Sequence, residues 1–333
     1  MHLRYPTLSC DMLVGPEIAP TGVGSARPLL SVMIPTFNCA RFLEQTIRSV
    51  LTQGHANEDM EIVVVDDAST KDDPEAVVRN VASSRIRFER NPVNSGAAAN
   101  FNRCLQLSSG RLVHILHGDD FVRSDFYLRI ARAFEQYPEI DLVSCRSFVV
   151  DESGVVEWIT PKIGTEREGR ISIEQIATSN GISTPSVVVR RSFYERHGGF
   201  LTELTHVADW EMWCRAAQFG GALFINEPLA YYRLFPGNET SRLARTGRNV
   251  AEYIVLADLL EARGVSVEAT RQYAVRAAFG QLTRFLANKD MDAYHANVRF
   301  YKAYAKNLGL RERITNQFRM LRMQRTISTT LLV

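Results

Sequence analysis

Short apolar segments alternate with amphipathic ones over the first third of the chain, and this alternation limits the possible folds more than any other feature. Strand-like runs occupy residues 29–35, 61–67, 86–88 and 112–116. Helical patterns begin near Asn38, Pro74 and Ala97. Strands that alternate with helices usually form a parallel sheet with helices on both faces. The sequence therefore predicts an α/β fold built on a mostly parallel sheet.

Polar loops follow three of these strands, with the sequences PTFN, DDAST and HGDD. In open α/β sheets, ligands bind outside the carboxyl ends of the strands, so the loops should meet at one edge. The third loop ends in Asp119 and Asp120, two carboxylates that repel each other unless a positive charge lies nearby. Mg²⁺ commonly binds one or two carboxylates together with substrate phosphates. An Asp-rich turn is the alternative, but the convergence of the loops favours a metal–diphosphate site.

Composition and missing motifs exclude several classes of protein. The formal net charge is +2, which gives no general reason to expect nucleic-acid binding. Neither GxxxxGK[ST] nor GxGxxG occurs, so a P-loop NTPase or a typical NAD-dependent dehydrogenase is not expected. The five cysteines form no CxxC pair and are expected to be reduced core thiols. With no signal peptide pattern and no apolar run near ~18 residues, a cytoplasmic protein is expected.

Three segments differ in composition. Residues 1–28 are rich in proline and glycine and are expected to be a loose N-terminal extension, and residues 29–245 form the α/β domain. Residues 246–333 read as three or four amphipathic helices. Between Lys302 and Arg325 there are seven basic residues and one acidic residue. Such helices can contact anionic lipid at the inner face of the plasma membrane; a solvated face or a homodimer contact is the alternative.

Ordered motifs from Leu29 to Ser241 resemble those of the family 2 glycosyltransferases, whose fold is called GT-A. SVMIPTFN is similar to the opening strand and Pro-Thr-aromatic-Asn loop of that family, and EIVVVDDAST to its Asp-Asp-x-Ser loop. NSGAAANFNRCLQLSSGRLVHILHGDD resembles the helix that leads to the metal motif. HGGF, ADWEMWCRAAQFG and YYRLFPGNETS resemble the acceptor-side turn, the Glu-Asp-Trp helix and the Tyr-Arg segment.

The resemblance implies a role for each matching residue. Nucleotide-sugar donor contacts are implied for Pro35, Thr36, Asn38, Asp67, Gly96, Asn100, His117, Asp119 and Arg233. Asp119, together with Asp120, would hold Mg²⁺ or Mn²⁺ on the diphosphate. Acceptor contacts are implied for Gly199 and Trp210. Asp209 would deprotonate the acceptor hydroxyl as it attacks the anomeric carbon, and a single displacement of this kind inverts the configuration.

Several of these residues have a second interpretation. His117 occupies a position where the family commonly has the first aspartate of Asp-x-Asp, so it is a metal ligand, a diphosphate donor or a neutral neighbour of the site. Ala208 replaces the glutamate that usually precedes Asp209. Asp209 itself could be a helix N-cap. Trp210 could be a core residue, and Arg233 could form an ordinary surface ion pair.

The resemblance thus implies a metal-dependent inverting glycosyltransferase. The expected donor is a nucleotide-diphosphate sugar, with a UDP-sugar favoured. The expected acceptor is a saccharide, free or lipid-linked, in the synthesis of cell-surface polysaccharide or glycoconjugate. Two alternatives remain at this point. One is a catalytically silent protein of the same fold that binds nucleotide sugars or glycans, and the other is a sugar-phosphate nucleotidyltransferase.

Overall fold

The computed structural model describes residues 15–22, 27–53, 59–81 and 84–330, with side chains up to residue 320. The chain divides into two compact units. The first comprises the described residues up to Ile176 together with Asn180–Leu234. The second comprises Ala177–Ser179 and the chain from Phe235 onward. Each unit is described separately below.

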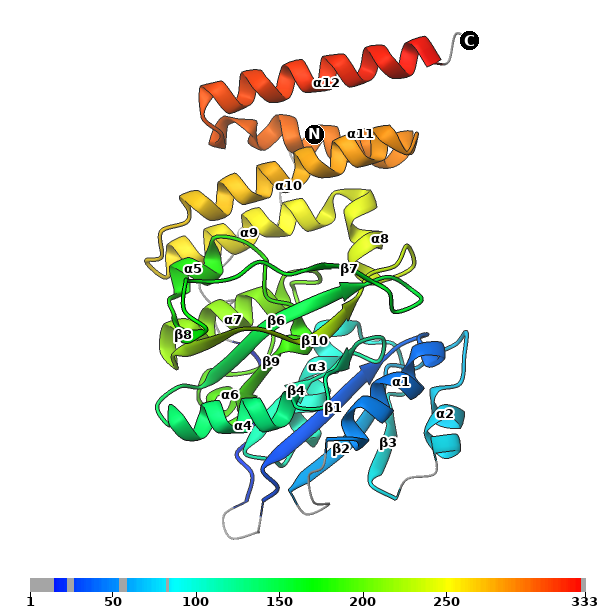
Figure 1. The fold of residues 1–333 in the computed structure, drawn as a ribbon, viewed down its shortest axis with the longest axis vertical. Coiled ribbons are helices and arrows are strands. Elements are labelled where there is room, and N and C mark those ends of the chain that lie inside the picture. Colours follow the sequence, from blue (N-terminus) through cyan, green and yellow to red (C-terminus); the bar gives the residue numbers. More distant parts are fainter. Residues whose placement is uncertain (1–14, 23–26, 54–58, 82–83, 331–333) are drawn as a thin grey trace. The chain divides into compact units, whose positions relative to one another are not determined.

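Within the described residues, the strands of the first unit form one mixed sheet (Figure 1). Its strands are β1 (Leu30–Thr36), β2 (Met60–Asp66), β3 (Ile86–Arg90), β4 (Leu112–Ile115), β5 (Phe121–Val122), β6 (Leu142–Val150), β7 (Val156–Ile159), β8 (Glu168–Ile171), β9 (Val187–Arg190) and β10 (Ala222–Arg233). Their order is β3-β2-β1-β4-β9-β6-β10-β5, while β7 pairs with β6 and β8 with β10.

The parallel half of this sheet brings the polar loops together. β1 pairs in parallel with β2 on one side and with β4 on the other, so all three strands end at the same edge. Every residue of β1 is buried, as expected for a strand covered on both faces. Beyond β4 the sheet becomes mixed, because β9 pairs antiparallel with both β4 and β6.

Helices cover the sheet where their apolar stripes predict it. The helices before residue 235 are α1 (Ala40–Leu51), α2 (Pro74–Val81), α3 (Ala97–Leu107), α4 (Phe126–Gln136), α5 (Ile173–Ala177), α6 (Arg191–His197) and α7 (Ala208–Phe219), with the 3₁₀ turn η2 (Thr184–Ser186). Leu43, Ile47 and Val50 of α1 pack with Val32 and Ile34 of β1 in one buried cluster. Their spacing of three and four residues places them on one helix face.

The described part of the N-terminal extension is not loose. Residues 15–22 have no regular secondary structure, yet Ile18 is fully buried. The carbonyl of Pro16 accepts a hydrogen bond from the Gly199 amide, and that of Ala19 accepts from Arg191. The expectation of a loose segment is therefore wrong for these residues, and residues 1–14 lie outside the described part.

The second unit is helical. It contains α8 (Glu239–Thr246), α9 (Arg248–Ala262), α10 (Glu268–Ala287), α11 (Met291–Tyr304), the 3₁₀ turn η3 (Ala305–Asn307) and α12 (Leu310–Thr330). Apolar side chains from α8 to α11, among them Val275, Leu282 and Phe300, form its core. Gly247, at a φ of 71°, joins α8 to α9 in a left-handed conformation that favours glycine. Among the residues that the structure describes, none of the helices combines the length and apolarity needed to traverse a bilayer.

The predicted α/β fold with a C-terminal helical region is confirmed, with differences in detail. β10 is one continuous strand with irregular pairing around Pro228, whereas the sequence indicated two strands. The short strands β5 and β8 were not expected, and the sheet is mixed rather than mostly parallel. The two units divide between Leu234 and Phe235, so α8 groups with the second unit instead of ending the first.

The close packing of β1 against the start of β4 yields a test. A Cβ atom added at Gly110 would lie 2.6 Å from the amide nitrogen of Ser31 and 2.7 Å from the carbonyl carbon of Leu30. We therefore expect Gly110→Ala to lower the free energy of unfolding by about 1–3 kcal/mol, the usual cost of overpacking. Gly22→Ala is the control, because nothing lies within 4 Å of the added atom. Equal urea unfolding curves for the two variants would contradict this account.

Candidate functional site

The loop after β4 brings three potential ligand atoms together. His117, Asp119 and Asp120 each offer one ligand atom, and these atoms lie within 4.8 Å of one another. His117 and Asp119 are partly buried, and Asp120 is fully buried. The ring of His117 also stacks on Phe101 of α3, with the ring centroids 5.2 Å apart. The predicted pair of aspartates and the histidine thus form one cluster.

Three elements hold this loop in place. Gly118 donates its amide hydrogen bond to the carbonyl of Pro35 at the end of β1. Thr46 of α1 donates to the carbonyls of Gly118 and Asp120, at 3.0 and 2.7 Å. Arg233 of β10 donates from its backbone amide to Asp120 Oδ1 and from Nε to the carbonyl of Asp119. The positions of the carboxylates are therefore fixed by bonds to the loop backbone.

Arg233 does not have the role predicted for it. Its side chain is buried, and each of its nitrogens donates a hydrogen bond within the protein. Nη1 donates to the carbonyls of Asp151 and Glu152, and Nη2 donates to Gln45 Oε1. Both the donor-binding prediction and the surface ion pair are thus wrong for Arg233. It links the loop after β4 to α1 and to the turn after β6.

The charges of the cluster strongly affect one another. Burial and the charge of Asp120 raise the pKa of Asp119 to about 7, against the opposing effects of His117 and Arg233. Burial opposes protonation of His117, but Asp120, Asp119 and Asp209 outweigh it and raise the pKa of the imidazole. The protein alone therefore leaves excess negative charge here, which a bound cation would offset.

Two buried atoms of the cluster have no hydrogen-bond partner among the described residues. They are Asp120 Oδ2 and His117 Nε2. Asp120 Oδ2 lies 3.5 Å from His117 Nδ1, which is long for a hydrogen bond. Buried polar atoms normally have partners, so an unpaired carboxylate oxygen beside a second carboxylate fits a site for a cation with oxygen ligands.

Asp209 lies in the first turn of α7 and is partly exposed. Its Oδ2 accepts a hydrogen bond of 2.9 Å from Thr184 Oγ1, and its Oδ1 accepts one from the amide of Trp210. The N-cap residue of α7 is Val207, so Asp209 is not the helix cap. The charge of Asp209 contributes to the raised pKa of His117, which places this carboxylate beside the cluster.

Asp67 was predicted to hold the nucleotide, but its carboxylate is already occupied. Oδ1 accepts from the Asn91 side chain and the Ser95 hydroxyl, and both oxygens accept from the Ser95 amide. Oδ2 also accepts from the amide of Gly96 at 2.9 Å. Asp67 is therefore a positioning residue for the loop that begins α3, and the prediction of direct contact with the base is wrong.

The other predicted donor residues differ in accessibility. Asn100 is buried and bonds to the carbonyl of Val65, so it cannot contact a ligand directly, contrary to the prediction. Asn38 Oδ1 accepts from the amides of Thr70 and Lys71, which joins the first two loops. Gly96 is exposed at a φ of 87° with open space beside it, as a close approach of ligand to backbone requires.

Pro35 and Thr36 lie at the buried end of β1. The carbonyl of Pro35 accepts from Gly118 and that of Thr36 from the amide of Asp67. Thr36 Oγ1 lies 2.9 Å from Cys39 Sγ. The structure thus brings both residues to the edge where the loops meet, with their described contacts made inside the protein. Phe37, the next residue, is 45% exposed there.

The two residues predicted to contact the acceptor are buried instead. Trp210 is 1% exposed, and its indole N–H donates to the carbonyl of Ile176. A Cβ atom on Gly199 would lie 2.2 Å from Asn102 Oδ1, and the Gly199 carbonyl accepts from Arg215. Both predictions are wrong, because these residues are packed inside the first unit.

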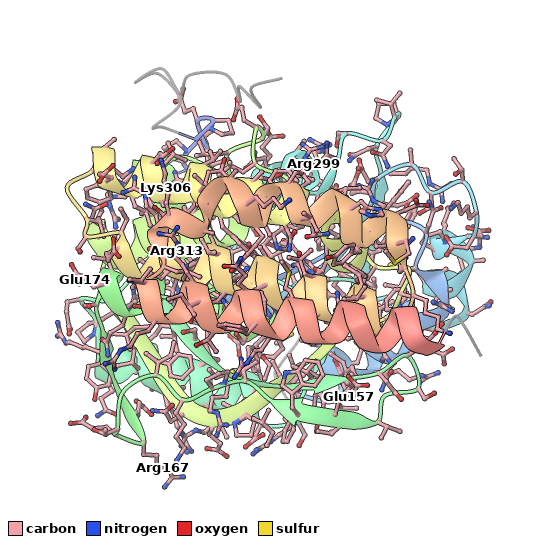
Figure 2. The ribbon with its side chains drawn as sticks, turned by 90° about the horizontal axis from the view of Figure 1, so that it is seen from above. Glu157, Arg167, Glu174, Arg299, Lys306 and Arg313 are labelled. Carbon is pink, nitrogen blue, oxygen red and sulfur yellow. The ribbon has the colours of Figure 1, made fainter. Side chains whose placement is uncertain are left out.

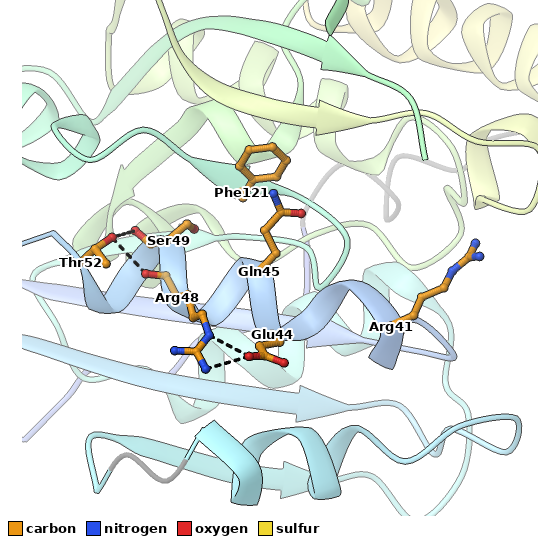
Figure 3. Close-up of a pocket in the computed structure, with 7 residues that line it drawn as sticks. All are labelled: Arg41, Glu44, Gln45, Arg48, Ser49, Thr52 and Phe121. Atoms are coloured by element: carbon orange, nitrogen blue, oxygen red, sulfur yellow. Dashed lines mark hydrogen bonds and ion pairs between the residues drawn. The ribbon is translucent and has the colours of Figure 1, made fainter. Parts of the chain in front are cut away.

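A separate open cavity of about 590 Å³ lies along α1. Figure 3 shows the residues that line it, which are Arg41, Glu44, Gln45, Arg48, Ser49, Thr52 and Phe121. It contains none of the predicted site residues. Gln45 nevertheless connects it with the cluster, because its side chain accepts a hydrogen bond from Arg233.

Sequence reasoning missed three residues that bear on the site. Thr46 could have been found, because it is a polar residue on the apolar face of α1, between Leu43 and Ile47. Phe37 belongs to the recognised loop after β1, yet only its exposure distinguishes it. Thr184 has no local signal, since its bond to Asp209 spans 25 residues of sequence.

Comparison with known proteins gives the family. Residues 31–197, half of the chain, match the profile described as "Glycosyl transferase family 2". The chain belongs to this family. It is a glycosyltransferase with the predicted GT-A fold. An uncharacterised protein of Mycobacterium tuberculosis, MT1568, is 30% identical to this glycosyltransferase over 72% of its chain and 78% of the relative.

Two named relatives describe the range of the family. "UDP-Glc:alpha-D-GlcNAc-diphosphoundecaprenol beta-1,3-glucosyltransferase WfaP" of Escherichia coli is 26% identical, over 51% of this glycosyltransferase and 78% of the relative. The solved structure of "Mannosyltransferase PcManGT from Pyrobaculum calidifontis in complex with GDP-Man and Mn2+" superimposes with a TM-score of 0.54 at 17% identity. It covers 97% of this chain and 84% of that one, and at this identity it shows the shared fold.

The role of Asp67 can be tested without any nucleotide. In Asp67→Asn, an amide group replaces an oxygen that accepts backbone N–H groups. We expect the free energy of unfolding to fall by about 1.5–3 kcal/mol, as for hydrogen bonds to a charged group. Asp73→Asn is the control, because Asp73 is exposed and caps α2, and asparagine caps equally well. Unchanged stability of the nucleotide-free Asp67→Asn protein would contradict a positioning role.

Proposed function

We propose that this protein is a metal-dependent inverting glycosyltransferase that uses a nucleotide-diphosphate sugar, with a UDP-sugar favoured. The observation that carries the proposal is the placement of a partly exposed carboxylate, Asp209, beside the cluster of His117, Asp119 and Asp120. The name of the E. coli relative supports a UDP-sugar donor and a lipid-linked saccharide acceptor. The proposed setting is the synthesis of cell-surface polysaccharide or glycoconjugate.

Asp119 and Asp120 would hold Mg²⁺ or Mn²⁺, with the unpaired Asp120 Oδ2 facing the ion. Hard carboxylate oxygens suit both cations, and the mannosyltransferase of the same fold is described with Mn²⁺. When bound, the ion would act as a Lewis acid that stabilises charge on the departing nucleoside diphosphate. His117 lies close enough to contact the ion or the diphosphate, and its raised pKa favours a role as a hydrogen-bond donor.

The donor's nucleotide would lie at the edge where β1 and β2 end. Phe37 offers an exposed phenyl face there, and Gly96 offers open backbone. Asp67, Asn100 and Arg233 would act indirectly, by holding the loops that form this edge. Pro35, Thr36 and Asn38 would complete the wall through their backbone and loop contacts.

The metal site makes a direct prediction. In Asp119→Ala, one of the two carboxylates is lost while the hydrogen bond from Arg233 to the Asp119 carbonyl can remain. We expect Mn²⁺-dependent binding of UDP to be lost, as measured by calorimetry with and without Mn²⁺. Asp59→Ala, at an exposed position, is the control. If the Asp119 variant bound UDP with unchanged affinity in Mn²⁺, Asp119 would not be a ligand.

Asp209 would be the general base. A base must lie within about 3 Å of the hydroxyl that it deprotonates. The hydrogen bonds from Thr184 and the Trp210 amide fix the orientation of the carboxylate while its partial exposure leaves room for an acceptor. The proton of the acceptor hydroxyl would pass to Asp209 as the oxygen bonds to the anomeric carbon. The bond to the diphosphate oxygen breaks on the opposite side, which inverts the configuration.

The base makes a second prediction. Asp209→Asn keeps the size of the side chain and can still accept the bond from Thr184, but it cannot take a proton. We expect normal folding, near-normal donor affinity and a kcat about 10²–10⁴-fold lower, the range for general base catalysis. The measurement is release of nucleoside diphosphate in the presence of acceptor. Equal transfer rates for the Asn and Asp proteins would rule out this role.

We also propose that the enzyme works in the cytoplasm, in peripheral contact with the inner face of the plasma membrane. The four cysteines among the described residues are free, and three of them are fully buried. Burial raises the pKa of the Cys145 thiol to about 12, so this group is poorly reactive. Such thiols suit a reducing compartment.

A further inference from the structure

The outer face of α12 carries exposed apolar side chains in a regular row. Leu310 is 69% exposed, Ile314 is 44% exposed and Phe318 is 68% exposed. Their spacing of four residues places them along one side of the helix. We call these three residues the α12 stripe. Large apolar side chains exposed together in this way commonly mark a binding surface.

The opposite face of α12 attaches the helix to the second unit. Asn316 is buried, and Met320 packs against the core of that unit. Glu312 forms an ion pair with Arg276 of α10. At 100° per residue, these three positions lie roughly opposite the stripe. The stripe is therefore not the face by which α12 packs on its own unit.

Basic side chains border the stripe. Arg311 and Arg313 are exposed and lie on either side of it, and Figure 2 labels Arg313 on α12 and Lys306 just before the helix. Arg319 is also exposed. The single acidic residue between Lys302 and Arg325 is Glu312, which is paired with Arg276. The free charge around the stripe is therefore positive.

We propose that α12 lies in the interface of an anionic membrane, with Leu310, Ile314 and Phe318 inserted among the lipids. An apolar stripe with cationic side chains along its borders is typical of helices that bind in the plane of a membrane. The arginines would then meet anionic headgroups. A second copy of α12 would bring the same positive charge to the contact, which disfavours pairing between copies. The inference refines the proposed peripheral contact, and its evidence does not depend on sugar transfer.

The experiment measures binding of the full-length protein to vesicles of phosphatidylcholine with and without phosphatidylglycerol, by co-sedimentation. We expect binding to vesicles that contain phosphatidylglycerol. The triple variant Leu310→Ser, Ile314→Ser, Phe318→Ser should bind them roughly tenfold more weakly or less, because the inserted area is lost. The variant Arg311→Gln, Arg313→Gln, Arg319→Gln should also lose binding, and salt should weaken binding of the unmodified protein.

A matched control changes exposed apolar residues elsewhere. Val93→Ser, Leu128→Ser, Phe219→Ser alters side chains of the first unit that are 67%, 46% and 53% exposed, and it should bind vesicles normally. Equal binding by the stripe variant and this control would overturn the proposal, as would failure of the unmodified protein to bind anionic vesicles. A dimer that the stripe variant dissociates, without vesicle binding, would instead assign the stripe to a second copy. Donor binding and transfer are measured separately, so failure of the proposed activity leaves this result unaffected.

Discussion

The site depends on a buried arginine that never needs to touch a substrate. Arg233 holds the carbonyl of Asp119 and the carboxylate of Asp120 while its other nitrogens bond to α1 and to the turn after β6. Burial lowers the pKa of this guanidinium, and the charges of Asp120 and Asp119 oppose that effect. Because guanidinium presents several donors in a fixed plane, it can join three backbone segments where a lysine could not. The ends of β4 and β10 are thereby held in one geometry.

Adjacent carboxylates are costly to bury, and the structure offsets this cost only in part. Arg233 is directed mainly at carbonyl oxygens and at Asp120 Oδ1, so Asp119 keeps a pKa of about 7 and Asp120 Oδ2 keeps no partner. Bound Mg²⁺ or Mn²⁺ would reverse the balance by favouring both ionised forms. The incomplete neutralisation therefore fits a site that completes its charge with a cation and a diphosphate.

The sequence predicted the fold well because strand ends are local features. Apolar runs that stop at polar loops located β1, β2 and β4 within a residue or two, and the topology then brought HGDD beside the other loops. Individual roles failed where they depended on partners distant in sequence. Asp67 is occupied by Ser95 and Gly96, Trp210 bonds to Ile176, and Arg233 bonds to Gln45, across 188 residues. No local pattern records which polar side chains are already satisfied by the fold.

Strand β4 serves both halves of the proposed chemistry. It ends in the cluster of carboxylates, and its buried His114 lies 3.0 Å from the carbonyl of Pro185, next to Thr184, which holds Asp209. A carbonyl can only accept, so His114 Nε2 carries the proton and Nδ1 accepts from the Tyr127 hydroxyl, at 2.9 Å. Burial lowers the pKa of His114 to about 3, so this neutral arrangement persists at physiological pH. The relative placement of base and metal ligands is thus set by one strand, while Asp209 keeps the partial exposure that an acceptor requires.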